Sequence, residues 1–172
     1  ATGFTYTALP TITTVSPAAG LATGGTTVTV TGTGFQAGAT VRFGATTGTV
    51  QQVTSTAITV QAPAGSAGAV NVVVTNPDGG TATRASGFTY TALPTITTVS
   101  PATGLATGGT TVTVTGTGFQ AGATVRFGAT TGTVQQVTST AITVQAPAGS
   151  AGAVNVVVTN PDGGTATRAS GF

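Results

Sequence analysis

Hydrophobic and polar residues alternate along much of the chain. Between positions 26 and 31, Val28 and Val30 are separated by threonines, so one face is apolar and the other carries hydroxyl groups. This period of two is typical of a half-buried antiparallel strand. Six further segments have the composition or the alternation of strands: residues 11–15, 41–43, 49–53, 57–60, 69–75 and 81–90. The pattern predicts an all-β sandwich of about seven strands.

The chain contains two nearly identical halves. A shift of 84 residues aligns 88 residue pairs, and only two of them differ: Thr2 against Ser86, and Ala19 against Thr103. This period is too long for a solenoid repeat, but it suits one small sandwich domain per repeat. We predict a first domain over residues 9–91 and a second over residues 92–172, whose last strand is truncated. We interpret residues 1–8 as the last strand of a preceding repeat and as a candidate donor strand.

The segment 76–80, Asn-Pro-Asp-Gly-Gly, separates two predicted strands. Proline fixes φ in a turn, aspartate accepts hydrogen bonds from the turn backbone, and glycine tolerates positive φ. We therefore predict a hairpin in which Asp78 caps the turn, and the same role for Asp162, with calcium binding as the weaker alternative. Arg84 and Arg168 follow these turns, and we expect each to form a weak surface pair with the aspartate across its hairpin.

Several motifs together resemble the IPT/TIG family, and they occur in both halves. In the first half they lie at residues 10–17, 20–30, 32–35, 41–44, 75–80 and 87–90. The bacterial surface-protein members of the family are the most similar. The resemblance implies two tandem immunoglobulin-like β-sandwiches and a habit of tandem extension. It implies no single activity, because function is added to such folds separately.

The composition argues against most kinds of active site. Charged residues make up 3% of the chain, as four arginines and two aspartates, and there is no His, Lys, Glu, Cys, Met or Trp. A hydrolytic triad lacks its base, a metal cluster lacks its usual ligands, and no basic patch can neutralise phosphates. We predict that the chain is not an enzyme, with no catalytic residue, cofactor, metal or nucleic-acid partner. No apolar run approaches the ~20 residues of a membrane helix, so we predict no membrane insertion by this segment.

The ends of the predicted domains carry the candidate assembly and junction residues. They are the aromatic residues of the last strands and the linker between the domains: Phe4, Tyr6, Phe88, Tyr90, Leu93, Pro94 and Phe172. The short linker contains a proline, which limits hinge motion and predicts a stiff rod. Two interpretations stay open. In the first, the chain is a segment of a longer array of identical repeats. In the second, Phe4 and Tyr6 of one molecule complete the β-sheet of the second domain of another molecule, head to tail.

The sequence thus favours a structural role. With 44 threonines and a net charge of +2, the units have a nearly neutral hydroxyl surface and repel one another little. We predict a repeat unit of an extracellular filament or adhesin stalk on a prokaryotic cell surface, with other copies of itself as partners, head to tail and laterally. One alternative is an adhesin module that binds a ligand or glycan, although no residue pattern supports a glycan. The other is a spacer domain of a secreted polysaccharide-active enzyme.

Overall fold

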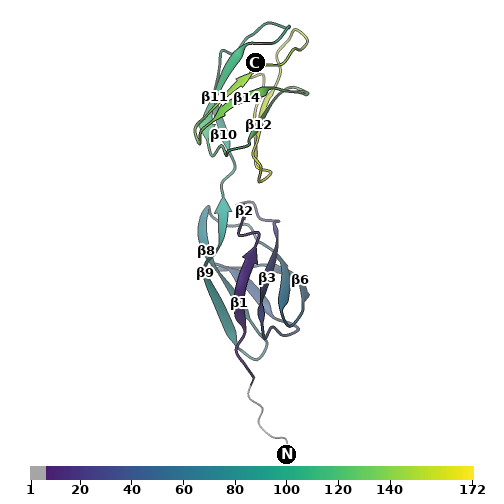
Figure 1. The fold of residues 1–172 in the computed structure, drawn as a ribbon, viewed down its shortest axis with the longest axis vertical. Helices are drawn as coiled ribbons and strands as arrows, with labels where there is room; N and C mark the ends of the chain where they lie inside the picture. Colours follow the sequence, from purple (N-terminus) through teal and green to yellow (C-terminus); the bar gives the residue numbers. More distant parts are fainter. Residues whose placement is uncertain (1–6) are drawn as a thin grey trace, which may run out of the picture. The chain divides into compact units, whose positions relative to one another are not determined.

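The computed structural model describes residues 7–172, which form two compact units that divide between Thr91 and Ala92. We call them unit 1 and unit 2. Each unit consists of two β-sheets (Figure 1). Residues 7–172 contain no helix, and hence no helix long and apolar enough to cross a membrane. The predicted all-β fold with two tandem sandwiches is confirmed.

Unit 1 has a four-stranded and a five-stranded sheet. The first sheet is antiparallel and has the order β1 (Thr11–Ser16), β3 (Thr27–Thr33), β7 (Ala57–Gln61), β6 (Thr49–Val53). The second has the order β2 (Ala19–Leu21), β9 (Thr81–Thr91), β8 (Gly68–Thr75), β4 (Thr40–Phe43), β5 (Thr46–Thr47). Its pairings are antiparallel except that of β2, which runs parallel to β9.

Unit 2 repeats this plan with two four-stranded sheets. The first has the order β10 (Thr95–Ser100), β11 (Thr111–Thr117), β15 (Ala141–Gln145), β14 (Thr133–Val137). The second has the order β13 (Thr130–Thr131), β12 (Thr124–Phe127), β16 (Val156–Thr159), β17 (Thr165–Arg168). Within residues 92–172 no strand corresponds to β2, and β17 is much shorter than β9. The two units therefore differ where the last strand ends.

The hydrophobic alternation decides which face of each strand is buried. Val28 and Val30 of β3 are fully buried, whereas the threonines between them are exposed. Val112 and Val114 of β11 behave in the same way. In each unit the apolar faces of both sheets contribute to one hydrophobic core, and the two cores share no residue. Because burial of apolar area is the main stabilising force in folding, each unit has its own source of stability.

A β-bulge interrupts β1 between Ile12 and Thr14 and leaves Thr13 as the extra residue. The carbonyl oxygen of Thr13 accepts a hydrogen bond of 2.8 Å from Nη1 of Arg84, which lies on β9 in the other sheet. No ion pair joins Arg84 to Asp78 among residues 7–172. The predicted pair across the hairpin is therefore wrong, because the bulge offers the guanidinium a carbonyl oxygen that the β-ladder leaves free.

The other arginines also donate to backbone carbonyls. Arg168 donates to Thr97 at 2.8 Å, in the equivalent bulge of unit 2. Arg42 donates to Ala45 at 2.9 Å, and its counterpart in unit 2 repeats this contact. All four cations of the chain thus stabilise turns or bulges.

The seven segments predicted as strands in unit 1 all form strands, and two short strands are additional. The first predicted strand, residues 11–15, corresponds to β1, which ends at Ser16. The chain then crosses to the other sheet and forms β2, which contains a glycine and has no alternation that sequence analysis could detect. β2 exists because β9 provides a parallel partner, so its formation depends on a residue pairing more than 60 positions away.

Candidate assembly site

The last strand of unit 1 ends in a groove that is filled by Tyr90. The Tyr90 side chain is 3% exposed, and its hydroxyl donates a hydrogen bond of 2.8 Å to the carbonyl oxygen of Pro63. Its ring lies so close to Gly65 that a methyl group on this glycine would be 2.6 Å from ring carbon Cε2. Burial raises the pKa of the Tyr90 hydroxyl, because the ionised form would lose its hydration. We call this pocket the strand-end groove.

Backbone hydrogen bonds hold the end of β9 from both sides. On one side β9 is antiparallel to β8, and Tyr90 lies opposite Gly68. On the other side it is parallel to β2, and Tyr90 lies opposite Gly20. Past these pairs, the carbonyl oxygen of Thr91 accepts a hydrogen bond of 2.8 Å from the N–H of Ala22. The Thr-Tyr-Thr end of β9 is thus bound like a central strand, with both edges paired.

Phe88 connects the groove to the core of unit 1. Its ring makes edge-to-face contacts with Phe43 and Tyr90, each with 5.1 Å between ring centroids. Such T-shaped pairs add to the stability that burial alone provides. The structure therefore places Phe88 and Tyr90, two of the predicted assembly residues, in a row of rings that ends in the groove.

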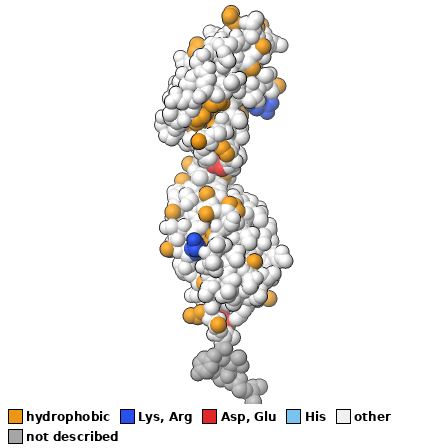
Figure 2. Space-filling model, in the orientation of Figure 1, with side chains coloured by type: hydrophobic (Ala, Val, Ile, Leu, Met, Phe, Trp, Pro, Cys, Tyr) orange, Lys and Arg blue, Asp and Glu red, His pale blue; other side chains and the backbone are white. Residues whose placement is uncertain are grey.

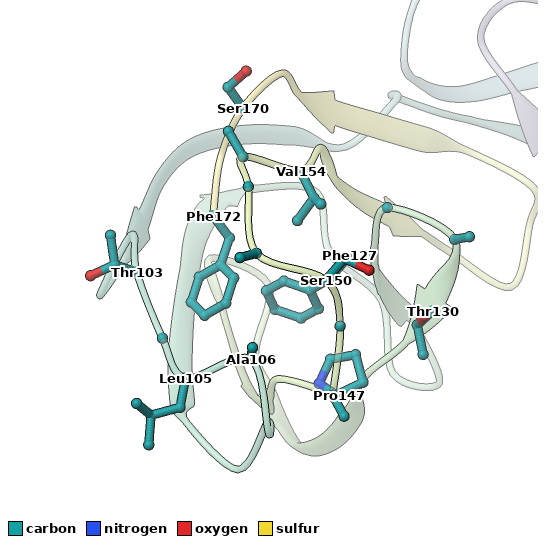
Figure 3. Close-up of a pocket in the computed structure, with 18 of the residues that line it drawn as sticks. Thr103, Leu105, Ala106, Phe127, Thr130, Pro147, Ser150, Val154, Ser170 and Phe172 are labelled. Carbon is teal, nitrogen blue, oxygen red and sulfur yellow. The ribbon is translucent and has the colours of Figure 1, made fainter.

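In unit 2 the equivalent groove is open. The row of rings contains the pair Phe127 and Phe172, with centroids 5.0 Å apart. The N–H of Val154 donates a hydrogen bond of 2.8 Å to the carbonyl oxygen of Phe172. Next to Phe172 lies a cavity of about 600 Å³. Figure 3 shows the two rings facing this cavity, with Pro147 and Leu105 at its edge.

The wall of the open groove repeats the residues that surround Tyr90. Pro147 and Gly149 correspond to Pro63 and Gly65 after the 84-residue shift. A methyl group on Gly149 would meet no atom within 4 Å. The N–H of Gly149 nevertheless donates a hydrogen bond of 2.9 Å to the carbonyl oxygen of residue 106, as its counterpart does in unit 1. The loop that forms the wall of the groove is therefore present in unit 2. Among residues 7–172, no side chain occupies the position that Tyr90 has in unit 1.

Side-chain exposure records the same difference between the units. Phe172 is half-buried, whereas its counterpart Phe88 is fully buried. Leu105 is 73% exposed, whereas its counterpart Leu21 is half-buried. Within residues 7–172, the apolar surface that the end of β9 covers in unit 1 is therefore not covered in unit 2.

The other predicted assembly residues lie elsewhere. Phe4 and Tyr6 lie outside the described residues. Leu93 is 42% exposed, and Pro94 is buried within unit 2. The Cα of Pro94 lies 3.4 Å from the position that a Cβ on Gly118 would occupy, so Pro94 packs against a turn of its own unit. The part of each residue in assembly stays a prediction.

Sequence reasoning missed Pro63, Gly65 and their counterparts in unit 2. They belong to an Ala- and Gly-rich loop with no alternation and no charge. Gly65 is not among the glycines with positive φ, so turn chemistry does not explain it. Position 65 requires a residue without a side chain, because the Tyr90 ring lies directly against it. This requirement becomes visible only when folding brings the loop and β9 together.

Asp78 is held by three hydrogen bonds in unit 1. Its carboxylate accepts from the N–H of Gly80 at 2.9 Å, from Nε2 of Gln36 at 2.6 Å and from the hydroxyl of Thr7 at 2.8 Å. These bonds, that of Gly80 first, hold the pKa of Asp78 below its usual value. The bond to Gly80 confirms the predicted capping role.

Within residues 7–172 no three His, Cys, Asp or Glu side chains gather in a group that could hold a metal ion.

The open groove is equipped for binding rather than for chemistry. Its lining consists of Ala, Gly, Ser, Thr, Pro, Leu, Val and Phe, none of which has an acidic, basic or charged side chain. It has the aromatic rings of Phe127 and Phe172 on one wall and several glycines in its lining.

Comparison with known proteins places the chain in a family of domains. The family model described as IPT/TIG domain matches residues 10–91 and again residues 94–172. No curated protein matches the chain. The observed strand pairing and this family match agree on two tandem immunoglobulin-like domains.

Similar solved structures come from larger proteins. The extracellular region of plexin A4 is 23% identical with a TM-score of 0.49, covering 88% of this chain and 17% of that one. SGBP-B from a xyloglucan utilization locus of Bacteroides uniformis is 24% identical with a TM-score of 0.44, covering 95% and 49%. The gamma-CGTase of alkalophilic Bacillus clarkii is 20% identical with a TM-score of 0.44, covering 95% and 25%. The chain spans less than half the length of each, and identities at this level concern the fold alone.

Proposed function

Because this chain belongs to the IPT/TIG domain family, we propose that it is a structural repeat unit of an extracellular filament or adhesin stalk on a prokaryotic cell. The observation that carries this proposal is the close similarity of the two units, which extends to the β-bulge near the start of each. Strands β1 and β3 pair with the same register as β10 and β11, bulge included, with every partner displaced by 84 residues. Identical units in series add length to a protein without adding a new activity.

The surface of the units supports this role. Figure 2 shows a visible face that is mostly neither charged nor hydrophobic, with isolated charged side chains. The outward positions of β3 and β11 are threonines, which are exposed. A hydroxyl surface of low charge permits copies to lie close together, because there is little like-charge repulsion to overcome.

The packing of the aromatic residues argues against the glycan-binding alternative. Carbohydrate modules commonly stack sugars on exposed aromatic rings. Among residues 7–172 every Phe and Tyr side chain is buried except Phe172, which is half-buried. The spacer alternative needs a catalytic domain in the same polypeptide, and it gives no reason for neighbouring units to be nearly identical.

Electron microscopy of the native cell surface tests the proposed function. We expect antibodies against the units to label a continuous fibre whose repeat is close to one domain length, ~40 Å from the rise of its strands. A glycan array on the purified chain provides the matched comparison. Labelling of isolated enzyme particles, or strong and specific retention of one glycan without any fibre, would contradict the structural role.

A further inference from the structure

We propose that the outer face of the sheet β1-β3-β7-β6 binds the same face of a second copy of this chain. The inference rests on the proposed structural role and deepens it, because it names the surface through which copies lie side by side. We call this surface the hydroxyl face, and its central residues are Thr14, Ser16, Thr29, Thr31, Gln52 and Thr59. Unit 2 repeats the face on β10, β11, β15 and β14, with every pair displaced by 84 positions.

Strand pairing arranges the polar side chains of this face in rows. Thr29 of β3 lies opposite Ser16 of β1 on one side and opposite Thr59 of β7 on the other. Gln52 of β6 lies opposite Thr59, so the row crosses all four strands. Neighbouring strands are about 4.8 Å apart, and residues on the same face of a strand are about 6.7 Å apart. A second copy has an array with the same two spacings, so the two arrays match each other as no unrelated surface is bound to do.

The hydroxyl group is complementary to itself, because it both donates and accepts hydrogen bonds. The protein already contains such a contact, since the hydroxyls of Thr11 and Thr33 on neighbouring strands are 2.8 Å apart and either can donate. The pair Thr95 and Thr117 repeats it in unit 2. A face of carboxylates or ammonium groups would repel its own copy, whereas two hydroxyl faces can bind each other. The threonine methyl groups add apolar area that contact removes from water.

The distribution of charge favours this face over the opposite one. β1, β3, β6 and β7 contain no charged residue. Both arginines of unit 1 are on the other sheet, Arg42 on β4 and Arg84 on β9. Arg42 is exposed between two buried neighbours, so it points outward from that sheet. Two copies in contact through their second sheets would bring like charges together, which is unfavourable.

A second copy also suits the hydroxyl face better than a polysaccharide does, although both are rich in hydroxyl groups. Sugar rings commonly stack on exposed aromatic side chains. β1, β3, β6 and β7 contain no aromatic residue, so the face has no ring on which a sugar could stack. Its repeated hydroxyl array therefore points to a protein surface of the same kind.

The first test places like charges on the hydroxyl face. In the 172-residue chain, Thr29→Lys together with Thr113→Lys adds one cation at the centre of the face in each unit. We expect sedimentation velocity to detect oligomers of the wild-type chain and to show self-association weakened by about tenfold or more in this variant. Scanning calorimetry should show that both units still unfold cooperatively.

The matched control adds the same charge to the other sheet. Thr83→Lys with Thr167→Lys changes exposed residues of β9 and β17, and this protein should associate like the wild type. Equal weakening in the two charged proteins overturns the proposal, and so does a wild-type chain that stays monomeric.

The second test asks whether one hydroxyl face meets another. Thr29→Glu with Thr113→Glu should weaken self-association as the lysine variant does. A mixture of the two should form mixed oligomers, because the Lys-bearing face attracts the Glu-bearing face. Added salt should weaken the mixed oligomers, since it screens exposed charges. Failure of the mixture to associate more strongly than either variant alone excludes contact between these faces.

Electron microscopy of cells separates this inference from the proposed function. We expect wild-type fibres to lie in bundles and fibres of the Thr29→Lys, Thr113→Lys protein to be separate. Unbundled wild-type fibres overturn the lateral contact and leave the structural role intact, whereas the absence of fibres contradicts the structural role even if the purified chain associates. Retention of a monomeric wild-type chain on a glycan array, abolished by the lysine variant, would assign the face to a polysaccharide and overturn the proposal.

Discussion

Asp78 carries one of only two side-chain carboxylates in the protein, and its contacts stabilise the ionised form. It accepts hydrogen bonds from Gly80, Gln36 and Thr7, and its pKa is lowered accordingly. Sequence analysis predicts the turn and the capping contact with Gly80, since that contact is local. It does not predict Gln36, which is 42 positions away in the chain. A single residue thus combines a contact of short range, visible in sequence, with one that only folding creates.

At the residue scale we predict a specific acid sensitivity for Asp78. The carboxyl has a lower pKa in the folded than in the unfolded state, so its stabilising contribution is present above about pH 4 and is lost as the pH falls through the folded-state value. Asp78→Asn should therefore lower the unfolding temperature of unit 1 at pH 7 and have little effect at pH 2. Scanning calorimetry at both pH values measures this. An equal effect of the substitution at both values would show that the charge plays no part.

At the level of the element, the bulge in β1 shows how one irregularity depends on several parts of the fold. Gly32 lies opposite Ile12 at the bulge, and a methyl group on Gly32 would overlap the carbonyl oxygen of Thr11. It would also lie 2.7 Å from Cζ of Phe35. Sequence analysis predicts both strands, because their alternation is clear. It cannot predict the bulge, because the extra residue is visible only once the strands are paired and Arg84 reaches its carbonyl.

We predict that Gly32→Ala destabilises unit 1 by about 3 kcal/mol, because a backbone oxygen cannot move aside as a flexible side chain would. Urea denaturation followed by circular dichroism measures this loss in the unfolding transition of unit 1. Gly149→Ala is the matched control, since its added methyl group meets no atom within 4 Å, and it should change stability by less than about 1 kcal/mol. Similar losses in the two variants would contradict the overlap argument.

At the level of the whole molecule, the protein consists of two units with separate cores. The core of unit 1 uses residues between Ile12 and Tyr90, and that of unit 2 uses residues between Ile96 and Phe172. The 84-residue repeat already predicts two equal domains. The truncated last strand of the second repeat also predicts where the two units differ, and the structure adds which side chains and backbone groups that strand end contacts in unit 1.

We predict that residues 7–91 fold alone with the unfolding temperature that unit 1 has in the whole chain, within a few degrees. The fragment keeps its entire core and the Tyr90 contacts that close the groove, and burial within the unit is its main source of stability. Scanning calorimetry of the fragment beside the 172-residue chain tests this, with residues 92–172 as the parallel fragment. A fall of ten degrees or more in residues 7–91 would mean that unit 1 depends on the rest of the chain.

The sequence by itself determined the strands, their buried faces, the repeat and the scarcity of reactive side chains. These properties are local or additive: alternation acts over a few residues, and composition needs no partner. Tertiary structure alone decided that β2 pairs with β9, that Arg84 binds a bulge carbonyl, and that the Tyr90 ring lies on Gly65. The Tyr90 hydroxyl and its acceptor on Pro63 are 27 positions apart, and Arg84 and its acceptor on Thr13 are 71 positions apart. No local pattern encodes such contacts, because only folding brings these residues together.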